Sequence, residues 1–192
     1  MSACDYIGSL YALPATTTSS AIQWQGKATH RIFAYLRPSM AACEAILTAL
    51  QSLDAEVICA VPGISSEWKA RYNRLRIFDH PVDLQPLLSH ADLAITYGAG
   101  TIATALLAGV PVMLVPQMAE QYLAGLPLER MGAGLMLREQ QSIEQCASLI
   151  NTLLTMPSYR QAAQAFAQRY ANFSTEQACQ RLWSAMKVKL EN

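Results

Sequence analysis

The stretch from Ala91 to Pro116 reads ADLAITYGAGTIATALLAGVPVMLVP, and it decides the fold class of this chain. Two apolar runs within it, Leu93–Thr96 and Val112–Val115, have the length of buried strands. Between them a glycine-containing turn, Tyr97–Thr101, opens a helix expected over Thr101–Ala108. A strand, a helix and a second strand in this order predict a crossover unit of a parallel sheet.

The same alternation extends in both directions from this stretch. Further strands are expected at Arg31–Leu36, Glu56–Val61, Leu75–Phe78 and Gly134–Leu137. The helices expected between strands are Met40–Leu53 capped by Ser39, a short helix capped by Ser65 or Ser66 and ending at Tyr72, Val82–Ser89, and one that ends at Met131 and is kinked by Pro127. The pattern predicts the α/β class, with a Rossmann-like, doubly wound parallel sheet of about six strands.

No strand is expected from Ser142 onward, where three helical segments fit: Ser142–Leu154, Ser158–Tyr170 and Ser174–Leu190. The last of them begins with a sequence typical of a capping box, Ser174 to Gln177. It also carries an apolar stripe formed by Ala178, Leu182, Ala185 and Met186, with Trp183 beside it. Such a stripe must face something apolar, either this sheet and its helices or another domain.

Composition excludes several classes of protein. The chain has 192 residues, of which 52% are apolar and 15% charged, so one domain with a sizeable core is expected. Lys and Arg together number 14 and so do Asp and Glu. A net charge of zero argues against binding to a nucleic-acid backbone. The mean hydropathy of +0.16 is high for so few charges, which suggests that a surface facing a partner, another domain or a membrane is covered in the native protein.

The cysteines indicate a reducing, cytoplasmic location. Their number is odd and their spacings are wide, which is typical of free thiols rather than of disulfides or metal ligands; they are Cys4, Cys43, Cys59, Cys146 and Cys179. No apolar run is long enough for a membrane span, and the first residues do not resemble a signal peptide. No Asp-x-Asp metal motif and no metal-ligand spacing occur, so no metal is expected.

The turn Tyr97–Thr101 is the strongest candidate for a binding site. Ligands of doubly wound sheets bind at the carboxyl ends of the strands, and this turn follows one. Gly98 and Gly100 let a ligand approach the backbone closely, and the free amides at the start of the helix attract anions. The alternative is a tight strand-to-helix turn without a ligand.

The order of motifs resembles the donor-binding, C-terminal domain of GT-B glycosyltransferases that use nucleotide sugars, a group that includes UDP-glycosyltransferases and macrolide glycosyltransferases. The resemblance runs from about Tyr6 to Leu137. It rests on the glycine turn, the Ala-Gly-Val-Pro sequence that ends at Pro111, the Glu120-Gln121 pair, and the Gly-Ala-Gly sequence that ends at Gly134. The resemblance divides the chain into an entry segment, 1–30, a donor-binding α/β domain, 31–140, and C-terminal helices of the same domain, 141–192.

The resemblance also implies the role of each site residue. The diphosphate of a nucleoside diphosphate sugar would lie against the turn formed by Tyr97, Gly98, Ala99, Gly100 and Thr101. Glu120 and Gln121 would hold the hydroxyls of the sugar, where the alternative is an exposed pair at a helix start. The loops that flank the nucleotide would contribute His80, Pro81, Val82, Arg37 and Ser39. The donor is a substrate, and no further cofactor is implied.

Two departures from the family pattern bear on activity. The family has a histidine in this turn, whereas here the turn is one residue shorter and Thr96 or Tyr97 stands in its place. Full enzymes also have an N-terminal domain that binds the acceptor and supplies the general base. The histidines at positions 30 and 90 are expected at the surface, so no catalytic residue is expected in this chain.

The function expected is that of the donor-binding half of a glycosyltransferase, of the hexosyltransferase type, which transfers a sugar to an acceptor hydroxyl and is inactive alone. Its partners would be a nucleotide sugar, carrying UDP or dTDP, and the missing acceptor-binding domain or a partner subunit; membrane contact would come only through that missing half. The alternative is a non-catalytic interaction module, or a subunit of a split glycosyltransferase, with a degenerate donor site. An epimerase is disfavoured because no Gly-x-Gly-x-x-Gly follows the first strand.

Overall fold

The computed structural model describes residues 22–26, 28–138, 142–172 and 174–190. Most of the expected entry segment, with Cys4 and the start of the family resemblance at Tyr6, lies outside these residues, as does the side chain of Ala185. Six parallel strands form one sheet in the order β3-β2-β1-β4-β5-β6. The strands are β1 Arg31–Tyr35, β2 Glu56–Ala60, β3 Arg76–Phe78, β4 Leu93–Thr96, β5 Val112–Leu114 and β6 Gly134–Met136. The expected Rossmann-like sheet is therefore confirmed.

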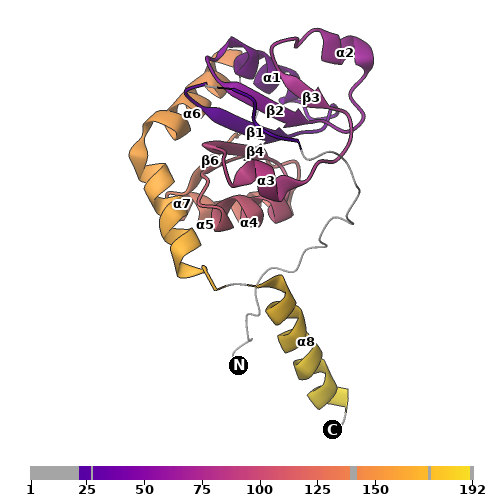
Figure 1. Ribbon diagram of the computed structural model, residues 1–192, viewed down its shortest axis with the longest axis vertical. Coiled ribbons are helices and arrows are strands. Elements are labelled where there is room, and N and C mark those ends of the chain that lie inside the picture. Colours follow the sequence, from indigo (N-terminus) through magenta and orange to yellow (C-terminus); the bar gives the residue numbers. More distant parts are fainter. Residues whose placement is uncertain (1–21, 27, 139–141, 173, 191–192) are drawn as a thin grey trace.

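Helices cover both faces of the sheet, and its strands are therefore buried on both sides (Figure 1). One face packs against α1 (Cys43–Ser52) and α6 (Ile143–Thr155), with α2 (Ser66–Ala70) at its edge. The other face packs against α3 (Leu84–Leu88), α4 (Ala99–Leu107) and α5 (Ala119–Arg130), and α7 (Pro157–Arg169) lies against α4. Along β1, Ile32 and Ala34 belong to the first face and Phe33 to the second, as the period of a strand requires.

Three helix starts lie two or more residues from the predicted ones. One is that of α3, which begins at Leu84 rather than Val82 because Asp83 caps it. The helix α1 begins at Cys43, not at Met40, and its N-cap, Ala42, makes no side-chain capping bond. The prediction that Ser39 caps it was wrong, because the segment forms turns in which Met40 N donates to Arg37 O (3.1 Å) and Cys43 N to Met40 O (2.9 Å). The helix α4 begins at Ala99 with Gly98 as its N-cap, two residues earlier than expected. Ser65 caps α2 as predicted.

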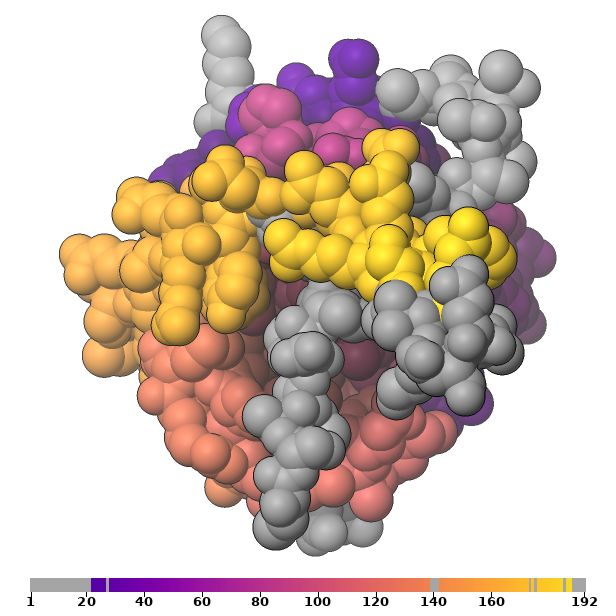
Figure 2. Space-filling view, turned by 90° about the horizontal axis from the view of Figure 1, so that it is seen from below, coloured from indigo at the N-terminus to yellow at the C-terminus, as the bar shows by residue number. Residues whose placement is uncertain are grey.

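The last helix, α8 (Thr175–Leu190), stands apart from the rest of the described chain (Figure 1). Seen from below, it lies across the side of the molecule nearest the viewer, in yellow (Figure 2). Gln177 N donates to Ser174 Oγ (3.4 Å), which is half of the predicted capping box. Ala178 is buried, but Trp183 is 60% exposed and Met186 47% exposed. The stripe is therefore buried at Ala178 and half-buried at Leu182, whereas Met186 and the neighbouring Trp183 remain exposed.

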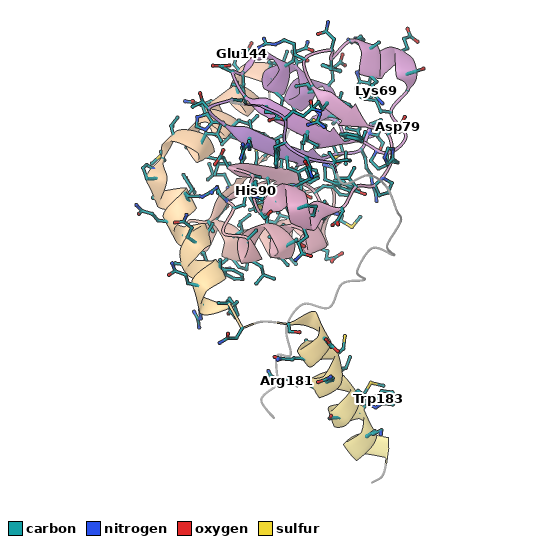
Figure 3. All side chains as sticks on the ribbon, viewed as in Figure 1. Lys69, Asp79, His90, Glu144, Arg181 and Trp183 are labelled. Carbon is teal, nitrogen blue, oxygen red and sulfur yellow. The ribbon has the colours of Figure 1, made fainter. Side chains whose placement is uncertain are left out.

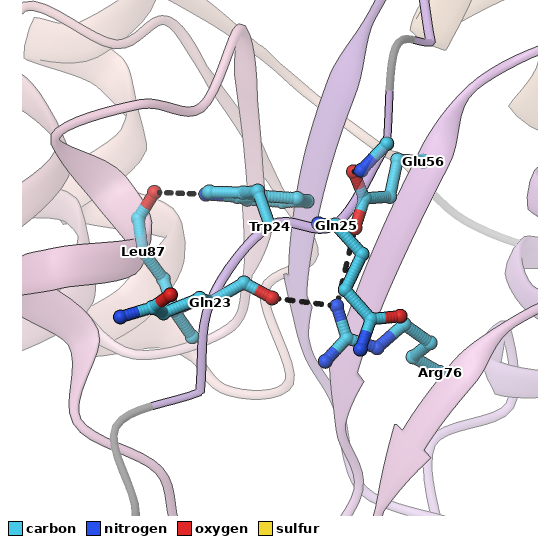
Figure 4. A network of polar contacts seen from close by, with 7 residues as sticks. Gln23, Trp24, Gln25, Glu56, Arg76 and Leu87 are labelled. Carbon is cyan, nitrogen blue, oxygen red and sulfur yellow. Dashed lines mark hydrogen bonds and ion pairs between the residues drawn. The ribbon is translucent and has the colours of Figure 1, made fainter.

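A segment preceding β1 is anchored at the amino edge of the sheet (Figure 4). Trp24 Nε1 donates to Leu87 O in α3 (3.1 Å). The backbone amides of Gln25 and Gly26 donate to the carboxylate of Glu56 at 2.7 and 2.8 Å, and Arg76 forms an ion pair with the same carboxylate at 3.1 Å. Partial burial raises the pKa of Glu56, but these bonds outweigh it, so the net pKa is lowered. This network fixes the entering chain at the edge opposite to the carboxyl ends of the strands.

The described cysteines are free, and three of them, Cys43, Cys59 and Cys146, are buried. Burial raises the pKa of Cys43 to about 12 and also raises those of Cys59 and Cys146. These thiols are therefore unreactive members of the core. None of the helices in the described part of the chain combines the length and apolar character needed to span a membrane.

Candidate functional site

The carboxyl edge of the sheet has one topological switch point, between β1 and β4. These strands are neighbours with Tyr35 opposite Thr96. The chain leaves β1 toward α1 on one face and leaves β4 toward α4 on the other face. The two connections diverge at this point, which is where doubly wound sheets bind their ligands. The segment after β1 contains Arg37, and the turn after β4 contains Tyr97.

Tyr97, Arg37 and Tyr35 form a cluster at this switch point. Arg37 Nε donates to the hydroxyl oxygen of Tyr97 at 2.6 Å. The guanidinium carbon of Arg37 lies 4.6 Å from the centre of the Tyr97 ring. The rings of Tyr97 and Tyr35 are stacked with centroids 5.8 Å apart, and only 8% of Tyr97 is exposed. Burial and the neighbouring Tyr97 raise the pKa of Tyr35, against a smaller lowering by the charge of Arg37.

The start of α4 is open to an anion. Gly98, the N-cap, has φ −103° and no side-chain cap, and its amide donates to Thr96 Oγ1 at 3.1 Å. The first amides of a helix have no intrahelical acceptor, so those after Gly98 are available to a ligand. Thr101 is only 8% exposed, and its hydroxyl makes no hydrogen bond with the residues that the structure describes. A Cβ built on Gly98 would meet nothing within 4 Å, so the fold itself does not require glycine there.

The pair Glu120 and Gln121 lies in the first turn of α5, directly after β5 at the same edge of the sheet. Gln121 Oε1 accepts from Gln117 N at 2.7 Å, which fixes the loop between β5 and α5. Its carbonyl oxygen is therefore engaged, and its amide group is left as a donor. Glu120 is exposed and has no ion pair within the described residues. The two side chains together offer one acceptor group and one donor group.

The loop after β3 follows the strand at one edge of the sheet. His80 is exposed, its Nδ1 is 3.0 Å from Asp79 Oδ1, and its ring meets Phe78 edge-on at 5.8 Å. Lys69 and Asp79 lie beside each other here, 3.8 Å apart (Figure 3). The hydrogen bond from His80 and the charge of Lys69 lower the pKa of Asp79.

The residues of this loop are not all equally available. Pro81 is exposed, and Val82 is half-buried against α3 and the sheet. The strand order β3-β2-β1 separates this loop from the switch point by two strands, and within the described residues no hydrogen bond, ion pair or ring contact joins His80 to Tyr97 or Arg37. Ser39, in the segment after β1, is exposed. The structure thus gathers Arg37 with the Tyr97 turn but leaves His80 apart from them.

A shallow hollow of about 390 Å³ lies elsewhere, beside β6. Its walls come from α5, β6 and α6, and its polar groups include Glu129, Gln145 and Ser148. Glu129 already accepts from Met136 N (3.0 Å) and pairs with Arg138, so its carboxylate is engaged. The hollow is two strands from the switch point, and we give it no part in the site.

The sequence did not reveal that Tyr97 and Arg37 are partners. They are 60 positions apart, and no local motif links them. Only the adjacency of β1 and β4 brings their side chains together. The closest available signal was the expectation that residues after strands gather at one edge. In the described part of the chain no group of three His, Cys, Asp or Glu is placed to hold a metal ion.

This fold is a Rossmann-like α/β domain, and the comparisons with known proteins identify its family. The erythromycin biosynthesis protein CIII-like C-terminal domain matches residues 44–181, well over half of the chain. The chain therefore belongs to this family, as the C-terminal domain of a GT-B glycosyltransferase.

Individual relatives agree with the family. The PGL/p-HBAD biosynthesis glycosyltransferase of Mycobacterium tuberculosis is 31% identical over 66% of this chain and 30% of that protein. A PGL/p-HBAD biosynthesis rhamnosyltransferase of Mycobacterium bovis is 31% identical over 65% of this chain and 28% of that protein. The solved spinosyn rhamnosyltransferase SpnG, complexed with thymidine diphosphate, has a TM-score of 0.64 and 25% identity, covering 97% of this chain and 50% of that one. The chain thus spans half or less of each relative.

Proposed function

We propose that this chain is the donor-binding half of a glycosyltransferase. The observation that carries the proposal is the start of α4 at Gly98, which has no side-chain cap and directly follows Tyr97, the residue whose hydroxyl accepts from Arg37. The diphosphate of the donor binds along the turn Tyr97–Thr101. The amides of the first turn of α4 and the hydroxyl of Thr101 donate to its oxygens.

The sugar and the base of the donor then extend to opposite sides of this point. Glu120 accepts from hydroxyls of a hexose, and the amide group of Gln121 donates to a neighbouring hydroxyl, since its carbonyl oxygen is held by Gln117. The base lies toward the loop His80–Val82, past Arg37 and Ser39. The support for this direction is the strand order, which places β5 on one side of β4 and β2 and β3 on the other.

The reaction we propose is a direct displacement. A bond forms between the acceptor oxygen and the anomeric carbon while the bond from that carbon to the diphosphate oxygen breaks. The proton of the acceptor hydroxyl passes to a base in the other half of the enzyme. The positive charge and amides at the start of α4 stabilise the departing diphosphate, so the residues of this chain supply that stabilisation without a metal ion.

The acceptor-binding half is the partner that we propose for this chain, as a preceding domain or a separate subunit. Two observations support it: the relatives are at least twice as long as the matched region, and α8 exposes Trp183 and Met186. An interaction module that has lost its donor site would use the same helix. The free thiols favour a cytoplasmic location.

The test of donor binding is a two-dimensional NMR titration of the chain with dTDP and with UDP. We use dTDP because the related SpnG was solved with thymidine diphosphate. Shifts centred on Gly98, Gly100 and Thr101 would support the proposal, with dissociation constants no tighter than sub-millimolar because the other half cannot close over the ligand. No shifts at millimolar ligand, or shifts confined to other regions, would favour the interaction module.

A second test concerns activity. We expect no transfer of sugar to an acceptor by the purified chain, because no described residue supplies an acceptor site and its base. The assay is chromatographic detection of a glycosylated product with dTDP-sugar or UDP-sugar as donor. Product formed well above the rate in buffer would show that one half suffices.

A further inference from the structure

The structure assigns to Arg37 the role of the cation that neutralises the donor diphosphate, and to Tyr97 the role of a positioning residue that holds its guanidinium in place. This inference rests on the proposed function and refines it. It moves the charged contact from the turn after β4 to the segment after β1.

The geometry fixes one end of the guanidinium and leaves the other end free. Arg37 Nε donates to Tyr97 Oη at 2.6 Å, and this is the side-chain hydrogen bond that Arg37 makes with the described residues. The two terminal nitrogens of Arg37 therefore remain available, in the planar fork that suits two phosphate oxygens. Tyr97 is itself rigid, because only 8% of its surface is exposed and its ring stacks on Tyr35. Little side-chain entropy is left for Arg37 to lose when an anion binds.

The charges at the switch point favour an anion. Arg37 has no carboxylate partner within the residues that the structure describes, whereas Arg71, Arg76 and Arg160 each pair with an acid. Its neighbours at the switch point, Tyr35, Tyr97 and Thr96, are neutral groups. The positive end of α4 begins one residue after Tyr97. An unpaired cation and a helix start of the same sign therefore meet at one point, which a diphosphate would neutralise.

Tyr97 acts through Arg37. Its hydroxyl oxygen accepts the bond that orients the guanidinium, but its own proton is free to donate elsewhere. A positioning role and a direct contact with phosphate therefore predict different results when the effects of the two substitutions on dTDP affinity are combined in one variant. If Tyr97 only positions Arg37, its hydroxyl is worth nothing to the ligand once Arg37 has lost its charge.

The experiment measures the affinity of the chain for dTDP and for thymidine, by NMR titration at one salt concentration. The variants are Arg37→Gln, Tyr97→Phe and their combination, and the control is Arg74→Gln, which removes an exposed arginine without a partner among the described residues. We expect Arg37→Gln to weaken dTDP by about tenfold or more and to leave thymidine unchanged. Tyr97→Phe keeps the stacked ring, and we expect a smaller loss of dTDP affinity. The double variant should equal Arg37→Gln, and the control should equal the wild type.

Each of the other outcomes would refute one defined claim: the role of Arg37, the role of Tyr97, or the proposed function. Undiminished dTDP affinity in Arg37→Gln, with binding by the wild type intact, would refute the inference and leave the proposed function standing. Losses that add in the double variant would refute the positioning role of Tyr97 and show that it touches phosphate directly. A wild-type chain that binds neither dTDP nor UDP would refute the proposed function and this inference with it. The unfolding midpoint of every variant is measured as well, so that a loss of binding is distinguished from a loss of folding.

Discussion

The glycine at position 98 offers a test that separates binding from folding. Its φ of −103° suits any residue, and a Cβ there would meet no atom within 4 Å. Alanine is a poorer N-cap than glycine, at a cost of about 1 kcal/mol, but it lowers the entropy of the unfolded chain by a comparable amount. We therefore expect Gly98→Ala to change the free energy of unfolding by less than about 1 kcal/mol.

The effect on binding should be much larger. The added methyl group would project from the start of α4, where the proposed diphosphate lies. It would lengthen or break at least one charged hydrogen bond, worth about 1.5–3 kcal/mol, which is about 10- to 100-fold in affinity. The fold supplies a contrasting glycine, since a Cβ on Gly134 would lie 2.1 Å from Val112 O in the neighbouring strand. Gly134→Ala should therefore lower stability by about 3 kcal/mol.

The assays are urea denaturation followed by circular dichroism and NMR titration with dTDP. The expected result for Gly98→Ala is a wild-type unfolding midpoint with strongly weakened dTDP binding. Wild-type affinity in a folded Gly98→Ala protein would show that no ligand approaches this backbone closely. It would refute the placement of the diphosphate at α4.

The remaining predictions concern stability. Deleting Ser174–Asn192 should lower the free energy of unfolding by less than about 3 kcal/mol, because Trp183 and Met186 are exposed. That value is the scale of losing large core side chains. Urea melts of the truncated and whole chains measure the difference, and a larger loss would show that α8 is part of this core. Glu56 has a lowered pKa, so its stabilisation is present above the unfolded value of about 4.3 and disappears as the pH falls through the folded value. Glu56→Gln should accordingly be less stable than the wild type at pH 7, by about 2 kcal/mol for the charged hydrogen bonds, and the difference should shrink at acidic pH; a gap that does not change with pH would contradict this account.

The network around Glu56 shows what sequence patterns leave out. Trp24 lies in a stretch without periodicity, and nothing near it in the sequence indicates a partner. In the fold it bonds to Leu87, 63 positions away, and the neighbouring amides bond to Glu56 at the start of β2. These contacts join a segment without periodicity to residues that are far away in the sequence. Hydrophobic periodicity therefore cannot predict them.

The sequence by itself determined the alternation of strands and helices, the parallel sheet and the family, because apolar runs, glycine turns and the Glu120-Gln121 pair are local features. It placed most element boundaries within a few residues and erred at Ser39, where the turn geometry of the segment after β1 prevailed over capping preference. The tertiary structure alone decided that Arg37 meets Tyr97, that the carbonyl oxygen of Gln121 accepts from Gln117, and that Trp183 and Met186 of α8 stay exposed. The physical reason is that strand order and helix docking are set by the burial of both faces of the sheet at once, which is a property of the whole chain and not of any short stretch.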